Sequence, residues 1–111
     1  MHIQTNTDRS VTGSDGLSAR GTTIVERALA RFSGRISRVE IHLSDENGAR
    51  GGDEDKRCMM EARLEGLQPI AVTHRAATVE QAMDGAADKL KRSIESLLGR
   101  LRDDEARTDT R

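Results

Sequence analysis

The chain has 111 residues, of which 33% are charged and 34% hydrophobic, and its formal net charge is −1. This length fits one domain, because single domains span roughly 50 to 250 residues. With one Phe and no Trp or Tyr, the core is predicted to be aliphatic, and binding by aromatic base stacking is excluded. No apolar run approaches the roughly 18 residues of a membrane span. One cysteine and no signal-peptide leader favour a soluble, cytoplasmic protein without a membrane partner.

The charges are segregated along the chain. Arginine predominates between residues 9 and 38, acids predominate between 40 and 55, and cations return between 89 and 102. A strongly dipolar surface is therefore expected although the charges nearly cancel. Nucleic-acid-binding domains are usually basic overall, so any anion binding would depend on local clusters.

The first half of the chain predicts a strand, a helix and a second strand. Residues 1–7 are extended in character and predict the first strand. Apolar residues then recur at threes and fours from residue 14 to Phe32, which predicts a helix capped by Ser14 or Asp15. Residues 35–44 alternate between apolar and polar, as in a half-buried strand.

The second half predicts two strands and a long helix. Residues 45–55 contain three Gly, one Asn and five acids and are interpreted as a mobile acidic loop. The alternating pattern resumes over residues 57–66, and residues 69–75 predict a last strand. The final helix is expected to begin after Thr78, its N-cap, and its apolar residues recur to Leu101.

This order defines an α+β domain with the arrangement β-α-β-β-β-α. It is best satisfied by a four-stranded sheet with two helices packed on one face. The other face would expose charged residues to solvent. These side chains could form ion pairs if opposite charges lie on neighbouring strands. We expect the domain to span residues 1–101 and residues 102–111 to be a disordered tail.

Three segments carry a family resemblance: RVEIHLSDENG, CMMEARLEG and AATVEQAMDGAADKL. Together with the element order, they resemble the ribosome hibernation promoting factor family, also called the ribosome-associated inhibitor or sigma-54 modulation protein family. The most specific part is in the last helix, at Thr78, Ala82, Met83, Asp84, Asp88, Lys89 and Leu90. The chain resembles a short form of this family, without the C-terminal dimerising domain of the long members.

The resemblance implies a fold and a role. The fold is similar to double-stranded RNA-binding domains. Such proteins bind the small ribosomal subunit and its rRNA near the decoding centre, in the channel used by messenger and transfer RNA. They block translation while ribosomes are idle under stress or starvation. The resemblance implies no catalysed reaction, no cofactor and no small-molecule substrate.

Basic residues of both helices are the predicted contacts to rRNA phosphates, since phosphate neutralisation supplies most sequence-independent affinity. Residues three or four apart are neighbours on a helix surface and could form one ridge. The predicted RNA-binding residues are Arg20, Arg27, Arg31, Lys89, Lys91, Arg92 and Arg100. The alternative is an ordinary solvated helix face, in which Asp84, Asp88 and Glu95 pair with the cations.

Other interpretations stay open. Residues 95–98 read ESLL where the family usually has a cluster of Lys and His, so a diverged relative that acts as a protein interaction module is the second functional hypothesis. Leu97, Leu98 and Leu101 could support a weak homodimer if they are exposed. Cys58 and His74 lack metal-ligand spacing and are interpreted as structural, and no arrangement of residues recommends an enzyme.

Overall fold

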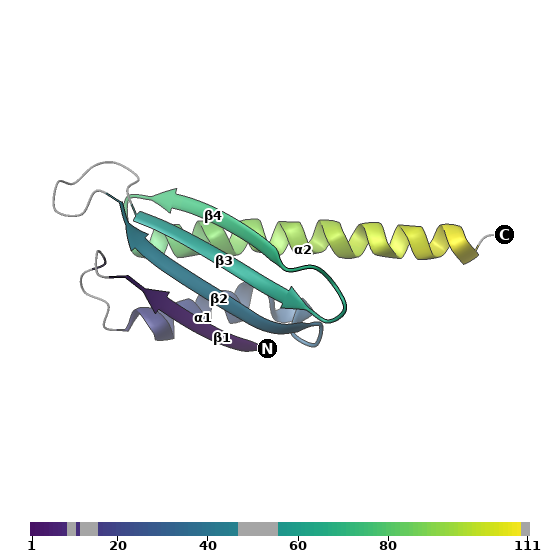
Figure 1. Ribbon diagram of the computed structural model, residues 1–111, viewed down its shortest axis with the longest axis horizontal. Coiled ribbons are helices and arrows are strands. Elements are labelled where there is room, and N and C mark those ends of the chain that lie inside the picture. Colours follow the sequence, from purple (N-terminus) through teal and green to yellow (C-terminus); the bar gives the residue numbers. More distant parts are fainter. Residues whose placement is uncertain (9–10, 12–15, 47–55, 110–111) are drawn as a thin grey trace.

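The computed structural model describes residues 1–8, 11, 16–46 and 56–109, with side chains in the last helix up to residue 106. The elements, in order, are β1 (His2–Thr7), α1 (Leu17–Ala28), the short 3-10 helix η1 (Ala30–Phe32), β2 (Ile36–Asp45), β3 (Lys56–Leu64), β4 (Ile70–Ala76) and α2 (Val79–Asp109). Both α-helices lie on the same side of the sheet (Figure 1). The predicted α+β architecture is confirmed.

The sheet has the strand order β1-β2-β3-β4, in which β1 is parallel to β2 and the other neighbours are antiparallel. A parallel pair needs a crossover connection, and α1 supplies it. The strands β1, β2 and β4 point the same way, and each helix returns across the sheet after a strand (Figure 1). The two helices are therefore parallel to each other.

One aliphatic core lies between the helices and the sheet. The alternating strand residues and the apolar stripes of the helices meet there, as the sequence pattern predicts. The largest side chains that are fully buried are Val25, Leu29, Val39, Ile41, Cys58, Met60, Met83, Leu90 and Ile94. Removal of this apolar surface from water is the main term that holds the helices on the sheet.

The first helix is shorter than the sequence pattern predicts. It ends at Ala28, and η1 completes the segment, because the last carbonyls of a helix often accept tighter bonds of the 3-10 type. This turn buries Phe32. The N-cap is Gly16, which has a positive φ of 80° and makes no side-chain cap bond. The predicted caps Ser14 and Asp15 lie outside the described residues.

The second helix begins as predicted and ends later. The amide of Gln81 donates a hydrogen bond to Thr78 Oγ1 at 3.1 Å, which confirms the N-cap. The helix continues to Asp109, so residues 102–109 are helical and the expected disordered tail is corrected there. Extending an existing helix needs no new nucleus, so a segment without an apolar stripe can remain helical. Figure 1 shows this end of α2 projecting beyond the sheet.

The three leucines considered for self-association are all partly buried. Leu98 packs against the core, and Leu97 and Leu101 are partly buried. Among the described residues, Met1 is the only large hydrophobic residue that is exposed. The dimer considered from the sequence required these leucines to be exposed, and they are not.

Candidate nucleic-acid interface

One side of α2, next to β4, gathers three cations and two hydroxyl groups. They line a concave region of about 460 Å³ together with Val72. We call this surface the β4 flank and define it by Lys89, Arg92, Ser93, Ser96 and Arg100. Its lining residues include no acid. A surface of this composition is suited to a phosphate group, because ammonium, guanidinium and hydroxyl groups all donate hydrogen bonds to phosphate oxygens.

Two of these cations already have partners within the chain. The ammonium of Lys89 donates a hydrogen bond to the backbone carbonyl of Thr73 in β4 at 2.9 Å. Arg92 pairs with Asp88, one helical turn away, at 2.9 Å, and both side chains are mostly exposed. The Asp88–Arg92 pair is the one that the i,i+4 spacing predicts. An exposed pair of this kind contributes only about 0.3 to 0.5 kcal/mol, so a phosphate could displace it at small cost.

The opposite side of α2 faces α1 and has a different balance of charge. Here a groove of about 340 Å³ is lined by two cations and two acids. We call this surface the α1 flank and define it by Arg27, Asp84, Asp88 and Lys91. Arg20 lies at the start of the helix pair and forms an ion pair with Glu80 at 3.4 Å. The acids of this side reduce its attraction for a polyanion.

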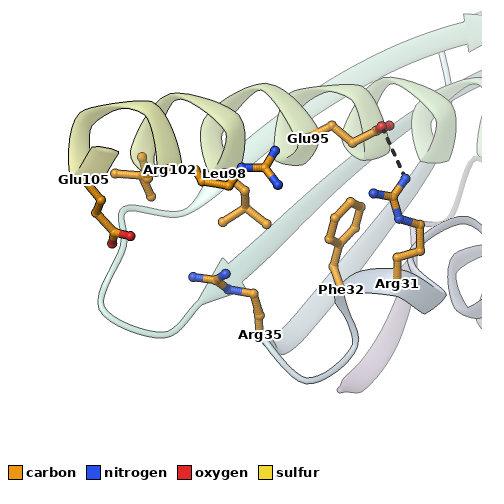
Figure 2. Close-up of a pocket in the computed structure, with 8 residues that line it drawn as sticks. Arg31, Phe32, Arg35, Glu95, Leu98, Arg102 and Glu105 are labelled. Atoms are coloured by element: carbon orange, nitrogen blue, oxygen red, sulfur yellow. Dashed lines mark ion pairs between the residues drawn. The ribbon is translucent and has the colours of Figure 1, made fainter. Parts of the chain in front are cut away.

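A third concave region, of about 470 Å³, lies between η1, the turn before β2 and the C-terminal half of α2. We call it the end groove, and its lining residues are Arg31, Phe32, Arg35, Glu95, Leu98, Leu101, Arg102 and Glu105. Figure 2 shows Arg31 directed toward Glu95, with an ion pair of 3.8 Å, while Arg35 approaches the groove from the turn before β2 and Arg102 approaches it from α2. The Arg31 guanidinium also lies 5.2 Å from the centre of the Phe32 ring.

The seven predicted RNA-binding residues therefore do not form one ridge. Lys89, Arg92 and Arg100 share the β4 flank, and Arg27 and Lys91 share the α1 flank. The remaining two, Arg20 and Arg31, are ion-paired at opposite ends of the helix pair. Helical spacing predicts which cations are neighbours on one helix, but it does not say which acids of the other helix face them.

Sequence reasoning missed four residues of these surfaces. Ser93 and Ser96 line the β4 flank, and their i,i+3 spacing on the same helix as Arg92 was a signal that could have found them. Arg35 and Arg102 line the end groove. Arg102 was assigned to the tail, and no local pattern links Arg35, in the turn before β2, to a helix far along the chain.

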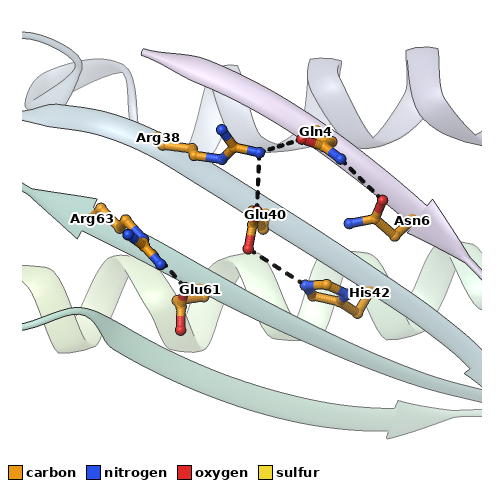
Figure 3. Close-up of polar contacts among 7 residues, drawn as sticks. All are labelled: Gln4, Asn6, Arg38, Glu40, His42, Glu61 and Arg63. Atoms are coloured by element: carbon orange, nitrogen blue, oxygen red, sulfur yellow. Dashed lines mark hydrogen bonds and ion pairs between the residues drawn. The ribbon is translucent and has the colours of Figure 1, made fainter.

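The face of the sheet away from the helices carries a network of charges (Figure 3). The register places Glu40 opposite Glu61 and Arg38 opposite Arg63, so like charges face each other across β2 and β3. The ion pairs instead run along each strand, from Arg38 to Glu40 at 3.0 Å and from Arg63 to Glu61 at 3.5 Å. The opposite charges on neighbouring strands that the sequence suggested do not occur at these two positions, but the register does place Asp45 opposite Lys56 at the end of β2.

Asp45 is the last residue of β2, and Glu46 follows it directly. Asp45 forms an ion pair with Lys56 at 3.2 Å, and Glu46 bridges Arg57 and Arg75. The predicted acidic loop therefore starts later than residue 45, and its residues 47–55 lie outside the described part of the chain.

Cys58 and His74 face each other across β3 and β4 beneath α2. Burial raises the pKa of the Cys58 thiol from 9.0 to about 12, and the nearby Arg57 opposes this shift. A buried, protonated thiol is chemically inert. Within the described residues, no group of three or more His, Cys, Asp and Glu side chains is placed to hold a metal ion. In the same residues, no helix is long and apolar enough to cross a bilayer.

The fold and the basic flank of α2 together define a β-α-β-β-β-α domain with a candidate surface for nucleic acid. Residues 7–102 match the model of the family described as sigma 54 modulation protein / S30EA ribosomal protein, and the chain belongs to this family. The resemblance stated from the sequence is thereby confirmed. The family is one of ribosome-associated proteins. A search of curated proteins found no match.

Two solved structures share the fold. One is a ribosomal subunit interface protein from Coxiella burnetii, with a TM-score of 0.68 and 20% identity, and the match covers 89% of this chain and 99% of that chain. The other is the N-terminal domain of Protein Y from Thermus thermophilus, with a TM-score of 0.62 and 22% identity, and the match covers 87% of this chain and 99% of that domain. At these identities the similarity concerns the fold.

Proposed function

We propose that this protein binds the small ribosomal subunit near the decoding centre and inhibits translation while the ribosome is idle. It acts in the cytoplasm, without catalysis, by contacts between basic side chains and rRNA phosphates. Membership in a family of ribosome-associated proteins supports the ribosome as partner. The name of the Coxiella burnetii protein, which refers to a subunit interface, supports the same place of action.

The observation that carries the proposal is the composition of the β4 flank. Three cations and two hydroxyl groups line it, and none of its lining residues is acidic. The net charge of −1 gives no general attraction to RNA, so binding depends on this local surface. Arg92 and Arg100 are the principal phosphate contacts of the proposal, and Lys89 adds positive charge while it bonds to β4. Arg27 and Lys91 are secondary contacts, because two acids share their groove.

Co-sedimentation with ribosomes tests this function. The protein is mixed at low salt with ribosomes from stationary-phase cells, and the mixture is separated on a sucrose gradient. We expect the protein in the small-subunit and whole-ribosome fractions, and we expect release as salt rises, because phosphate contacts displace counterions. A protein that stays at the top of the gradient at low salt would contradict the proposal.

The end groove favours a second candidate function, binding of another protein. Its three arginines and two glutamates surround two leucines and the edge of Phe32. This mixed composition suits a protein segment better than a polyanion, since glutamates repel phosphate. A pull-down in which Leu98→Asp or Leu101→Asp removes a protein partner, while ribosome binding is unchanged, would support this candidate.

A further inference from the structure

The outer edge of β4 is the feature that the proposed function leaves unexplained. β4 is the last strand of the sheet and, within the described part of the chain, pairs with β3 alone. In an antiparallel strand the N–H and C=O of one residue point to the same side. The carbonyl of Thr73 accepts its bond from Lys89, so the backbone groups of Thr73 lie on the outer edge. Unpaired groups of this kind are a template for another strand.

We propose that the outer edge of β4 is a surface that can pair with the β4 strand of a second copy of this chain, and that Lys89 prevents this pairing. The inference does not depend on ribosome binding. It gives Lys89, predicted from the sequence to contact RNA, a second role that follows from its 2.9 Å hydrogen bond to the strand.

The sequence of β4 is compatible with pairing to itself. A two-fold axis at Thr73 would place Thr73 opposite its counterpart and Ala71 opposite Arg75 of the other copy. Threonine pairs are favourable across antiparallel strands, and no like charges would face each other in this register. The joined sheet would contain the four strands of each copy in one continuous layer.

Lys89 opposes this pairing in two ways. Its ammonium occupies the carbonyl that a second strand would need. Its charge also matters, because the two sheets would join with their helices on the same face, which brings the β4 flanks of both copies toward each other. Lys89, Arg92 and Arg100 would then repel their counterparts. A lysine at a sheet edge is a common device against strand addition.

The test is the oligomeric state of Lys89→Met, in which the aliphatic stem is kept and the ammonium is lost. Lys91→Met is the matched control, because it removes the same charge from the α1 flank of the same helix. Sedimentation velocity over a range of concentrations should show a dimer dissociation constant at least tenfold lower for Lys89→Met than for wild type or Lys91→Met. Lys89→Gln, which removes the charge but keeps a donor, should fall between them.

A nitroxide label at position 73 reports where the copies meet. In labelled Lys89→Met we expect strong dipolar broadening, since the two labels would lie at the two-fold axis, and we expect none in the labelled control. Added salt should increase the dimer of Lys89→Met, because it screens repulsion between Arg92 and Arg100 of the two copies. Ribosome binding responds to salt in the opposite direction, so failure of one proposal leaves the other intact.

Three outcomes would overturn the inference. Lys89→Met could remain as monomeric as Lys91→Met, including at high salt. It could form a dimer without broadening at position 73, which would place the contact elsewhere. Wild type could already pair through position 73 with the same affinity as Lys89→Met, which would show that Lys89 does not close the edge.

Discussion

The two flanks of α2 carry similar cations in different surroundings. The β4 flank has three cations and no acid among its lining residues, whereas the α1 flank has two cations and two acids. Both belong to one helix of a chain whose net charge is −1. In the proposed function, the β4 flank is the main contact to phosphate because fewer acids share its surface, although Asp88 of the α1 flank pairs with Arg92.

The largest loss of stability is expected when the packing of α2 on the sheet is weakened, because α2 carries both flanks. Leu90 is fully buried between α2 and the sheet. Leu90→Ala should lower the free energy of unfolding by about 2 to 5 kcal/mol. Urea denaturation followed by far-UV circular dichroism measures this in a chain without Trp or Tyr. Leu97→Ala, at a partly buried position, should cost clearly less, and equal costs would contradict the burial that we assign to Leu90.

A smaller loss of stability is expected where α2 packs closely against β4. A Cβ atom at Gly85 would clash with the ring of His74, so Gly85→Ala requires the His74 side chain, or α2 against β4, to shift. We expect a loss of about 1 to 3 kcal/mol despite the better helix propensity of Ala. Gly99→Ala in the same helix meets nothing within 4 Å and should be stabilising. His74→Ala should rescue Gly85→Ala in the double variant, and lack of rescue would refute the steric explanation.

Removal of an acid from the end groove tests whether acids beside the cations oppose binding to RNA. Arg31 and Glu95 form a 3.8 Å pair with side chains that are 73% and 40% exposed. Glu95→Gln should therefore change the free energy of unfolding by less than about 1 kcal/mol. Affinity for the small subunit should rise by roughly threefold, which corresponds to well under 1 kcal/mol. A fall in affinity would show that Glu95 assists binding rather than opposing it.

The smallest effect on stability is expected from ionisation of the Cys58 thiol, which lies beneath the β4 flank. Because the pKa of its thiol is raised to about 12, the native protein should resist alkylation by iodoacetamide at pH 8. The unfolded chain ionises near the usual value of 9.0 while the folded chain does not. The buried, protonated Cys58 thiol therefore contributes its full stability below pH 9. The free energy of unfolding falls as the pH rises from about 9 to 12, because the thiol ionises first in the unfolded chain. Rapid alkylation of native protein would mean that this side of the sheet opens readily.

The sequence predicted the fold well because the fold depends on periodic burial. Alternation in the strands and the i,i+3 and i,i+4 stripe of α2 identify the residues that face the core, and Thr78 marks the start of α2 by a local hydrogen bond. The end of α2 was not predicted, because no apolar stripe marks residues 102–109 although they remain helical. The mutual positions of Glu40 and Glu61 depend on strand register, which periodicity leaves open.

The candidate site was predicted less completely than the fold. Neighbours on one helix, such as Asp88 and Arg92, follow from spacing alone. Contacts between elements do not follow from spacing, and these distinguish the surfaces: in the end groove Arg31 of η1 pairs with Glu95 of α2, and on the β4 flank Lys89 bonds to the backbone of Thr73. The sequence shows which residues can contact phosphate. Whether they are available for it depends on the acids and backbone carbonyls that they contact in the folded chain.

The most direct test of the account compares charge reversals on the two flanks. Arg92→Glu/Arg100→Glu and Arg27→Glu/Lys91→Glu change the net charge equally, and affinity for the small subunit is measured over a range of salt. We predict that the first pair weakens binding at least roughly tenfold more than the second and lowers the salt slope by about two, with similar melting temperatures. Equal losses from both pairs, or a larger loss from the α1 flank, would contradict the assignment of the β4 flank as the principal phosphate contact.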